Sequence, residues 1–213
     1  MAMNAELLAI LRRVPVIPVL TVEGPEDAVP LARALVEGGL PVLEVTLRTK
    51  GALKAIEAMA RDVPEAILGA GTVLSSSQIS EAMAAGAKFL VSPGSTVKLA
   101  EAAAVAGAPL LPGVATASEA MAMAEMGHHV LKFFPAEAAG GVSYLKSLGA
   151  PLPHLTFCPT GGIDAQKAKD YLALPNVVCV GGSWVTPSAA LKVGDYATVT
   201  RLARECIGLL GAR

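Results

Sequence analysis

The chain has 213 residues, a formal net charge of −1, 53% hydrophobic residues and 16% charged residues. This composition supplies ample material for a buried core and excludes a disordered polypeptide. Lysine and arginine are not clustered, and no basic segment is interleaved with aromatic residues. Neither a nucleic acid nor a membrane surface is therefore an expected partner.

The mean hydropathy of +0.55 is high, but proline and glycine interrupt the long uncharged stretches at 102–118 and 174–191. A membrane-spanning helix needs about 20 continuous apolar residues, so these stretches predict buried strands and helices instead. The N-terminal segment lacks the ordered basic, apolar and small-residue regions of a leader peptide, and we expect a cytoplasmic protein. Cys158, Cys179 and Cys206 have no metal-ligand spacing and are interpreted as buried free thiols.

One pattern recurs along the chain: a short β-branched or leucine-rich run, a turn, and an alanine-rich helical stretch. A short helix is predicted at 4–12. Strands are then predicted at 14–20, 42–47, 66–70, 89–91, 110–111, 130–133, 154–158 and 177–180. Helices are predicted at 26–38, 51–61, 76–86, 95–106, 117–126, 140–148, 164–172 and 195–210.

This alternation is typical of parallel β/α units, whose strands are covered on both faces. No linker or charge run divides the chain. We therefore expect an α/β protein with one compact (β/α)8 TIM-barrel domain over residues 1–213, preceded by a short N-terminal helix. A doubly wound open sheet is the alternative, and the lack of a G-x-G-x-x-G motif after the first strand weakens it.

Lys132 lies within the apolar run VLKFFP at residues 130–135. Removing an ammonium group from water is unfavourable, so a lysine in apolar surroundings tends to lose its proton. A neutral amine is a nucleophile towards carbonyl carbon. Lys132 is therefore a candidate Schiff-base residue, and the alternative is a lysine that ends a strand and extends its amine to water.

The strand predicted at 42–47 carries charge on one face, because alternation places Glu44, Thr46 and Arg48 on the same side. In a barrel that face points inward, where an ion needs a partner or a function. A structural ion pair is one interpretation. The other is a catalytic carboxylate and an arginine that meet Lys132, since active sites of such barrels gather at the carboxyl ends of the strands.

Glycine-rich turns follow the last two predicted strands, with the sequences PTGG at 159–162 and GGSW at 181–184. Glycine lets the backbone approach an anion closely, and helix N-termini present free N–H groups. The loops after strands seven and eight are the usual phosphate site of this fold. A further close-approach turn, GAGT at 69–72, adds the hydroxyl of Thr72.

Six motifs resemble, in the same order, those of the 2-keto-3-deoxy-6-phosphogluconate (KDPG) and 4-hydroxy-2-oxoglutarate aldolase family. They are EVTLRT at 44–49, GAGT at 69–72, VSPG at 91–94, LKFFPAE at 131–137, PTGGI at 159–163 and GGSW at 181–184. The resemblance implies a class I aldolase without metal or cofactor that forms a homotrimer. Its implied substrate is a phosphorylated keto acid, KDPG, which yields pyruvate and D-glyceraldehyde 3-phosphate. 4-Hydroxy-2-oxoglutarate, which yields pyruvate and glyoxylate, is a second implied substrate.

The resemblance also implies roles for single residues. Lys132 would form the Schiff base, and Glu44 would be the general acid and base. The residues implied to hold the pyruvyl carboxylate or to form apolar walls are Arg48, Thr72, Pro93 and Phe134. The residues implied to bind the phosphate are Gly161, Gly162, Gly182 and Ser183. Thr160 is implied as a further substrate contact.

Two other functions fit parts of the pattern. A phosphate-binding barrel isomerase or epimerase would use Glu44 as a proton-abstracting base and would leave Lys132 without a covalent task. A non-catalytic module that binds sugar phosphates would tolerate the loss of both residues. Borohydride trapping in the presence of pyruvate separates the aldolase from the isomerase.

Overall fold

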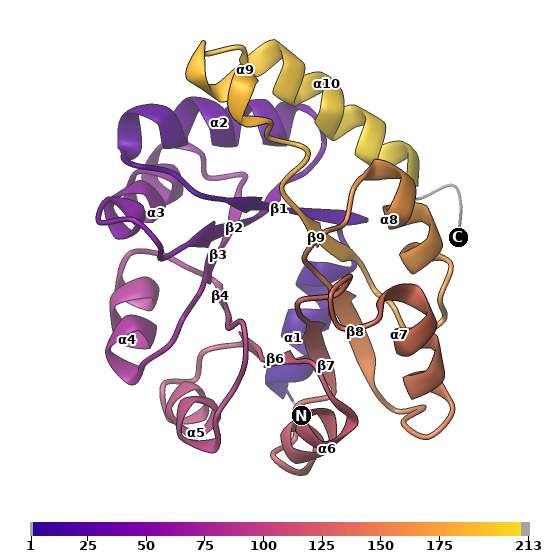
Figure 1. The fold of residues 1–213 in the computed structure, drawn as a ribbon. Helices are drawn as coiled ribbons and strands as arrows, with labels where there is room; N and C mark the ends of the chain where they lie inside the picture. The colour runs from indigo at the N-terminus through magenta and orange to yellow at the C-terminus, as the bar shows by residue number, and fades with distance from the viewer. Residues whose placement is uncertain (1, 210–213) are drawn as a thin grey trace.

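The computed structural model describes residues 2–209, in which parallel strands alternate with helices (Figure 1). The strands are β1 (Val16–Leu20), β2 (Val42–Thr46), β3 (Ile67–Gly71), β4 (Phe89–Val91), β5 (Leu110–Leu111), β6 (Gly113–Val114), β7 (Val130–Phe133), β8 (Thr156–Pro159) and β9 (Val180–Gly182). The helices are α1 (Ala2–Leu11), α2 (Pro25–Glu37), α3 (Ala52–Asp62), α4 (Ser76–Ala84), α5 (Val97–Val105), α6 (Ala117–Glu125), α7 (Gly141–Gly149), α8 (Ala165–Leu172), α9 (Ser188–Lys192) and α10 (Tyr196–Ile207).

The strands form a barrel from two parallel sheets. The larger sheet has the order β5-β4-β3-β2-β1-β9, and the smaller one has the order β6-β7-β8. The chain joins the sheets directly where β5 continues into β6, and parallel bridges Phe157↔Val177 and Thr160↔Gly181 join β8 to the β9 segment. The predicted (β/α)8 barrel is thus confirmed, with helices around the strands (Figure 1).

The predicted fifth strand is longer than expected and is divided in two. Pro112 separates β5 from β6 because proline has no N–H to donate to the ladder. Gly113 follows it, and a Cβ at this position would overlap the backbone of Ser92 and Pro93. Only glycine therefore allows the chain to bend so close to the loop after β4.

Two further differences lie near the C-terminus of the described chain. Helix α9 has no counterpart among the predicted elements, because five residues are too few to show a helical period. The predicted strand at 177–180 is shifted, since β9 pairs with β1 through residues 180–182. The apolar run at 177–180 indicates burial, whereas the glycines that complete β9 have low strand propensity.

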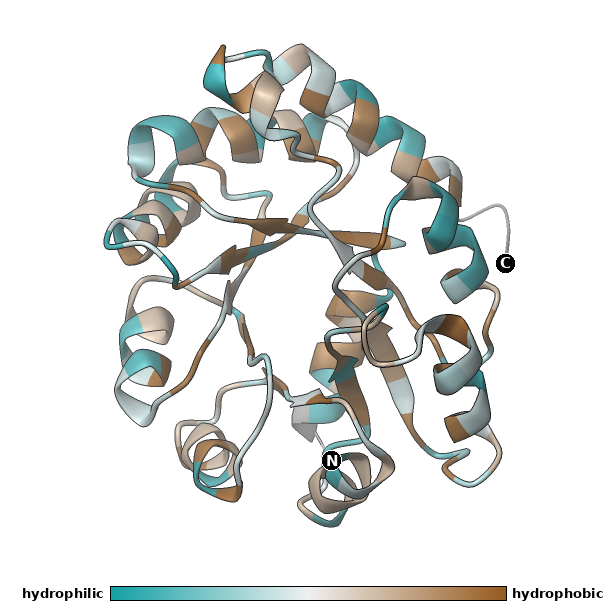
Figure 2. Cartoon of the chain, viewed as in Figure 1, coloured by the Kyte–Doolittle hydropathy of each residue, from teal (hydrophilic) through white to brown (hydrophobic). Residues whose placement is uncertain are grey.

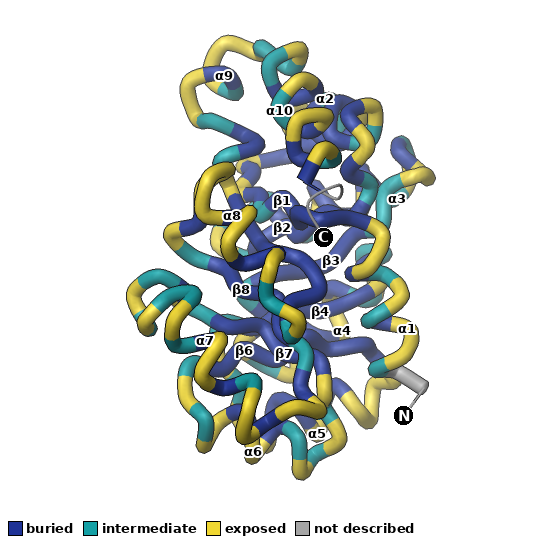
Figure 3. The backbone as a smooth tube through the Cα atoms, turned by 90° about the vertical axis from the view of Figure 1, so that its right-hand side faces the viewer, coloured by how far each residue is buried: buried dark blue, intermediate teal, exposed yellow. Residues whose placement is uncertain are grey.

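Hydrophobic residues follow the barrel strands and alternate with hydrophilic residues along the helices, as the brown and teal segments of Figure 2 show. The strands are buried on both faces, and exposure is concentrated on the outer helical turns and loops (Figure 3). Helix α1 contacts β5 and β7, where Leu7 and Leu11 are buried. Among residues 2–209 no helix has the length and apolar character needed to cross a membrane.

The parity of β7 decides which side chains enter the barrel. Phe133 stacks on Tyr144 of α7, with ring centroids 5.7 Å apart, so it faces the helices. Lys132 therefore faces inward, together with Cys158, its partner in register on β8. The Sγ atoms of Cys158 and Cys179 lie 3.6 Å apart, and all three cysteines are buried thiols, as predicted.

Candidate active site

Lys132 of β7 and Glu44 of β2 meet inside the barrel. Nζ of Lys132 donates to Oε1 and Oε2 of Glu44 at 3.1 and 3.4 Å. The two residues are only 5% and 3% exposed. The amine also lies 5.4 Å from the ring centroid of Phe134, within cation–π distance. An amine held between a carboxylate and an aromatic face can exchange protons with the carboxylate.

Gly71 provides the space for the Glu44 carboxylate. It lies on β3, next to Thr46 of β2 in register. A Cβ at this position would overlap Oε1 of Glu44 and would lie within 2.8 Å of its Cγ and Cδ. The carboxylate can therefore point into the barrel only because residue 71 has no side chain.

Arg48 and Thr72 form a second polar pair at the mouth of the barrel. Nε of Arg48 donates to Oγ1 of Thr72 at 3.1 Å, and the arginine side chain is exposed. Thr72 has a φ of 59°, in the left-handed region, which costs a β-branched residue roughly 1–3 kcal/mol. This strained conformation places a hydroxyl beside a guanidinium, an arrangement that can bind a carboxylate.

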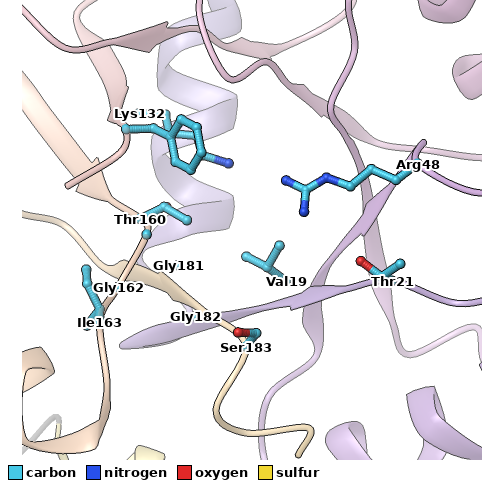
Figure 4. A pocket seen from close by; sticks show the side chains of 12 residues that line it. Val19, Thr21, Arg48, Lys132, Thr160, Gly162, Ile163, Gly181, Gly182 and Ser183 are labelled. Atoms are coloured by element: carbon cyan, nitrogen blue, oxygen red, sulfur yellow. The ribbon is translucent and has the colours of Figure 1, made fainter. Parts of the chain in front are cut away.

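A pocket of about 260 Å³ joins these groups. Lys132 and Arg48 point into it from opposite sides, with the glycine-rich turns along one wall (Figure 4). The size suits a small metabolite rather than a drug-sized ligand. Its lining residues are Val19, Thr21, Arg48, Lys132, Phe134, Thr160, Gly161, Gly162, Ile163, Gly181, Gly182 and Ser183.

Eight of the predicted site residues line this pocket, and three do not. Glu44 is hydrogen-bonded to Lys132, and Thr72 is hydrogen-bonded to Arg48, and both partners line the pocket. Pro93 is half-buried on the loop after β4, with its backbone against Gly113, and is not part of the lining.

Sequence reasoning missed Val19 and Thr21, and it gave no role of their own to Ile163 and Gly181, which lie in the predicted motifs. The alternation of β1 could have identified Val19 and Thr21, because both lie at its carboxyl end with the same parity. Thr21 is held in place through Thr46, whose buried hydroxyl lies 3.0 Å from Oγ1 of Thr21 and donates to the carbonyl of Leu20.

Thr160 lines the pocket, and its hydroxyl oxygen is buried. Within residues 2–209 its Oγ1 is the one buried side-chain nitrogen or oxygen without a hydrogen-bond partner. A Cβ at Gly181 would overlap this oxygen, so glycine there leaves the hydroxyl its space. An unpaired buried hydroxyl costs about 1–3 kcal/mol, which a bound ligand with a polar group would offset.

The turn after β8 presents backbone N–H groups on the pocket side. The carbonyls of Thr160 and Gly161 accept from the N–H groups of Ala136 and Glu137 at 2.8 and 3.1 Å. The carbonyl of Gly162 accepts from Lys167 Nζ at 3.1 Å. In a trans peptide the C=O group of one residue and the N–H group of the next residue point in opposite directions.

The N–H groups of Gly161, Gly162 and Ile163 are therefore turned away from these donors, towards the pocket that the same residues line. Gly161 and Gly162 have φ values of 106° and 77°, which favour glycine strongly. Successive N–H groups of this kind form an anion-binding concavity. Helix α8 follows directly, and the Asp164 side chain caps it by accepting from the N–H groups of Gln166 and Lys167.

No group of three or more histidine, cysteine, aspartate or glutamate side chains gathers as a metal site in the described part of the chain.

The family model described as "KDPG and KHG aldolase" matches residues 7–202. The "KHG/KDPG aldolase" of Escherichia coli strain K12 is 52% identical over 199 residues, which cover 93% of each chain. The "2-dehydro-3-deoxy-phosphogluconate aldolase" of Zymomonas mobilis is 49% identical over 197 residues, 92% of this chain and 93% of that relative.

Two solved structures are also similar. The KDPG aldolase from Legionella pneumophila, with pyruvate captured at low pH as a covalent carbinolamine intermediate, has a TM-score of 0.92 and 46% identity. The match covers 94% of this chain and 97% of that one. The KDPG aldolase of Zymomonas mobilis ZM4 with 3-phosphoglycerate has a TM-score of 0.93, 47% identity and 97% coverage of both chains.

These similarities extend over nearly the whole barrel and agree with the motifs that line its mouth. The chain belongs to the KDPG and KHG aldolase family and is an aldehyde-lyase.

Proposed function

We propose that the protein cleaves KDPG to pyruvate and D-glyceraldehyde 3-phosphate, with Lys132 as the Schiff-base nucleophile. The observation that carries this proposal is the buried amine of Lys132, 3.1 Å from the Glu44 carboxylate, in a pocket with an anion-binding turn. The carbinolamine formed by the Legionella relative supports an amine nucleophile in this family.

In the proposed mechanism the neutral amine of Lys132 attacks the C2 ketone, and the carbinolamine loses water to give an imine. The protonated imine draws electrons from the C3–C4 bond, which breaks and releases glyceraldehyde 3-phosphate. The remaining enamine is protonated and hydrolysed, which frees pyruvate and the amine. Glu44 transfers protons during dehydration and at the C4 hydroxyl, since its carboxylate contacts the amine.

The two ends of the pocket hold the two anionic ends of the substrate. Arg48 and Thr72 bind the carboxylate beside C2. The N–H groups of the turn after β8, together with Gly182 and Ser183, bind the phosphate. The phosphorylated three-carbon acid bound by the Zymomonas relative supports a phosphate subsite in this family. Phe134 forms an apolar wall over the imine, and Pro93 is assigned to the same wall from the resemblance alone.

The test is intact-mass measurement after incubation with pyruvate and borohydride, followed by peptide mapping. We expect one reduced pyruvyl group on Lys132. A folded protein that forms no adduct would exclude Schiff-base chemistry and favour proton abstraction by Glu44.

Thr160→Val is expected to raise the stability of the unliganded protein by about 1 kcal/mol, because it removes an unpaired buried hydroxyl at nearly constant volume. We further propose that the substrate supplies the missing hydrogen-bond partner of Thr160 Oγ1, so the same change is expected to lower kcat/KM for KDPG about tenfold. Thermal unfolding and steady-state kinetics measure the two effects. Thr186→Val, at a hydroxyl that donates to the Ser183 carbonyl, is the control and should destabilise. Unchanged kinetics of Thr160→Val would contradict the assigned contact.

We also propose 4-hydroxy-2-oxoglutarate as a second substrate, because it offers the same ketone and carboxylate to Lys132 and Arg48. The Escherichia coli relative is named for both activities. Release of pyruvate from this compound tests the proposal.

The resemblance further supports a homotrimer. Light scattering on the purified protein should give a mass three times the 21.6 kDa of one chain, and a monomer would exclude it. The cytoplasmic location stays a prediction.

A further inference from the structure

Three side chains lie behind the anion-binding turn, on the side away from the pocket: Glu137, Lys167 and Tyr171, which we call the Glu137 cluster. The hydroxyl of Tyr171 donates to Oε1 of Glu137 at 2.7 Å. Oε2 of Glu137 lies 2.8 Å from Nζ of Lys167. Lys167 Nζ in turn donates to the carbonyl of Gly162 at 3.1 Å. A continuous chain of hydrogen bonds thus connects the core to the edge of the pocket.

The core end of this chain is rigid. Tyr171 of α8 is 0% exposed, so its ring cannot change position without opening the core. Both oxygens of Glu137 are engaged, and the hydrogen bond from Lys167, followed by that from Tyr171, lowers the pKa of this carboxyl. Glu137 is therefore ionised throughout the neutral range and keeps the Lys167 ammonium in place.

The turn also packs directly on Glu137. A Cβ at Gly162 would lie 2.9 Å from both Cβ and Cγ of Glu137. The backbone N–H of Glu137 donates to the Gly161 carbonyl at 3.1 Å. Glu137 thus orients one peptide of the turn through its backbone and the next through Lys167.

We infer that the Glu137 cluster positions the phosphate-binding turn, with Lys167 fixing the Gly162–Ile163 peptide so that the Ile163 N–H faces the phosphate. This inference rests on the phosphate subsite of the proposed function. All three are positioning residues, because the hydrogen bonds of their side chains go to one another and to the back of the turn.

The exposure of the ion pair makes the inference testable. The side chains of Lys167 and Glu137 are 45% and 32% exposed, and ion pairs this exposed contribute little to stability. Substitution of Lys167 is therefore expected to spare folding and to alter only the orientation of the turn.

The experiment compares Lys167→Met with Lys169→Met on two substrates, KDPG and the unphosphorylated 4-hydroxy-2-oxoglutarate. Lys169 lies on the same helix and carries the same charge, and the described residues show no hydrogen bond or ion pair from its amine. For Lys167→Met we expect KM for KDPG to rise about tenfold. This is the typical effect of losing one charge-assisted hydrogen bond, here the one from the Ile163 N–H to the phosphate. We expect kcat for KDPG and kcat/KM for 4-hydroxy-2-oxoglutarate to stay at the wild-type level.

Two further measurements accompany the kinetics. Competitive inhibition by inorganic phosphate should weaken in Lys167→Met by the same factor as KM rises, and Lys169→Met should match wild type. Lys167→Arg, which keeps a donor for the Gly162 carbonyl and a charge for Glu137, should restore most of the KDPG affinity.

The outcomes distinguish the inference from the function on which it rests. A wild-type protein that shows no preference for KDPG over 4-hydroxy-2-oxoglutarate would exclude the phosphate subsite, and the inference with it. A wild-type preference that Lys167→Met retains in full would overturn the inference alone. Equal losses on both substrates would assign Lys167 a general structural role and would also overturn it.

Discussion

Replacement of Lys132 by arginine is expected to abolish KDPG cleavage, with a loss of kcat of about 10⁴-fold or more. A guanidinium stays protonated and cannot form an imine. Arginine keeps a positive charge opposite Glu44, so the buried pair retains its charge balance and the protein is expected to fold. Release of pyruvate in steady state, with circular dichroism to verify folding, measures the effect.

The matched control is Lys146→Arg on the exposed face of α7, which should leave turnover unchanged. Borohydride trapping with pyruvate should label wild type and Lys146→Arg but not Lys132→Arg. Turnover retained in Lys132→Arg would assign the nucleophile to another residue.

Glu44→Gln is expected to lower kcat by about 10²–10⁴-fold, the usual contribution of a positioned general acid or base. The amide preserves the shape of the carboxylate beside Gly71 but cannot take up or deliver protons. Rapid-quench borohydride trapping should show that imine formation is slowed together with turnover.

Stability should fall in the same variant. Removing one charge from a buried ion pair leaves the other uncompensated, which costs about 3–5 kcal/mol. The exposed Glu57→Gln on α3 is the control for both measurements. A nearly wild-type kcat in Glu44→Gln would show that the Glu44–Lys132 ion pair has only a structural role.

The order of strands and helices could be predicted because it depends on local patterns. Alternation along β2 also placed Glu44 and Arg48 on one face, and the ion pair of Glu44 with Lys132 shows that this face points inward. The exact ends of the strands and helices were harder to predict from the sequence. The division at Pro112 and the position of β9 depend on which neighbouring strand each segment pairs with, a long-range property.

The site shows the same limit. Motifs identified most of the pocket, but Val19 and Thr21 carry no chemical signature and belong to it only because β1 lies beside β2 and β9. The Glu137 cluster also could not be predicted from the sequence. Glu137 and Tyr171 are 34 residues apart, and nothing in their local sequences indicates that they hold one turn from behind.

Glu44 and Lys132 are separated by 88 residues and belong to different sheets, β2 in the larger and β7 in the smaller. The pair cannot exist until the two halves of the barrel have closed on each other, and contacts of such sequence separation form late because loop closure opposes them. Recovery of catalysis during refolding should therefore trail the recovery of helical signal and coincide with barrel closure. The rate at which enzymatic activity returns then reports the rate of the last step of folding. A polypeptide truncated before β7 would form helices but would have no activity.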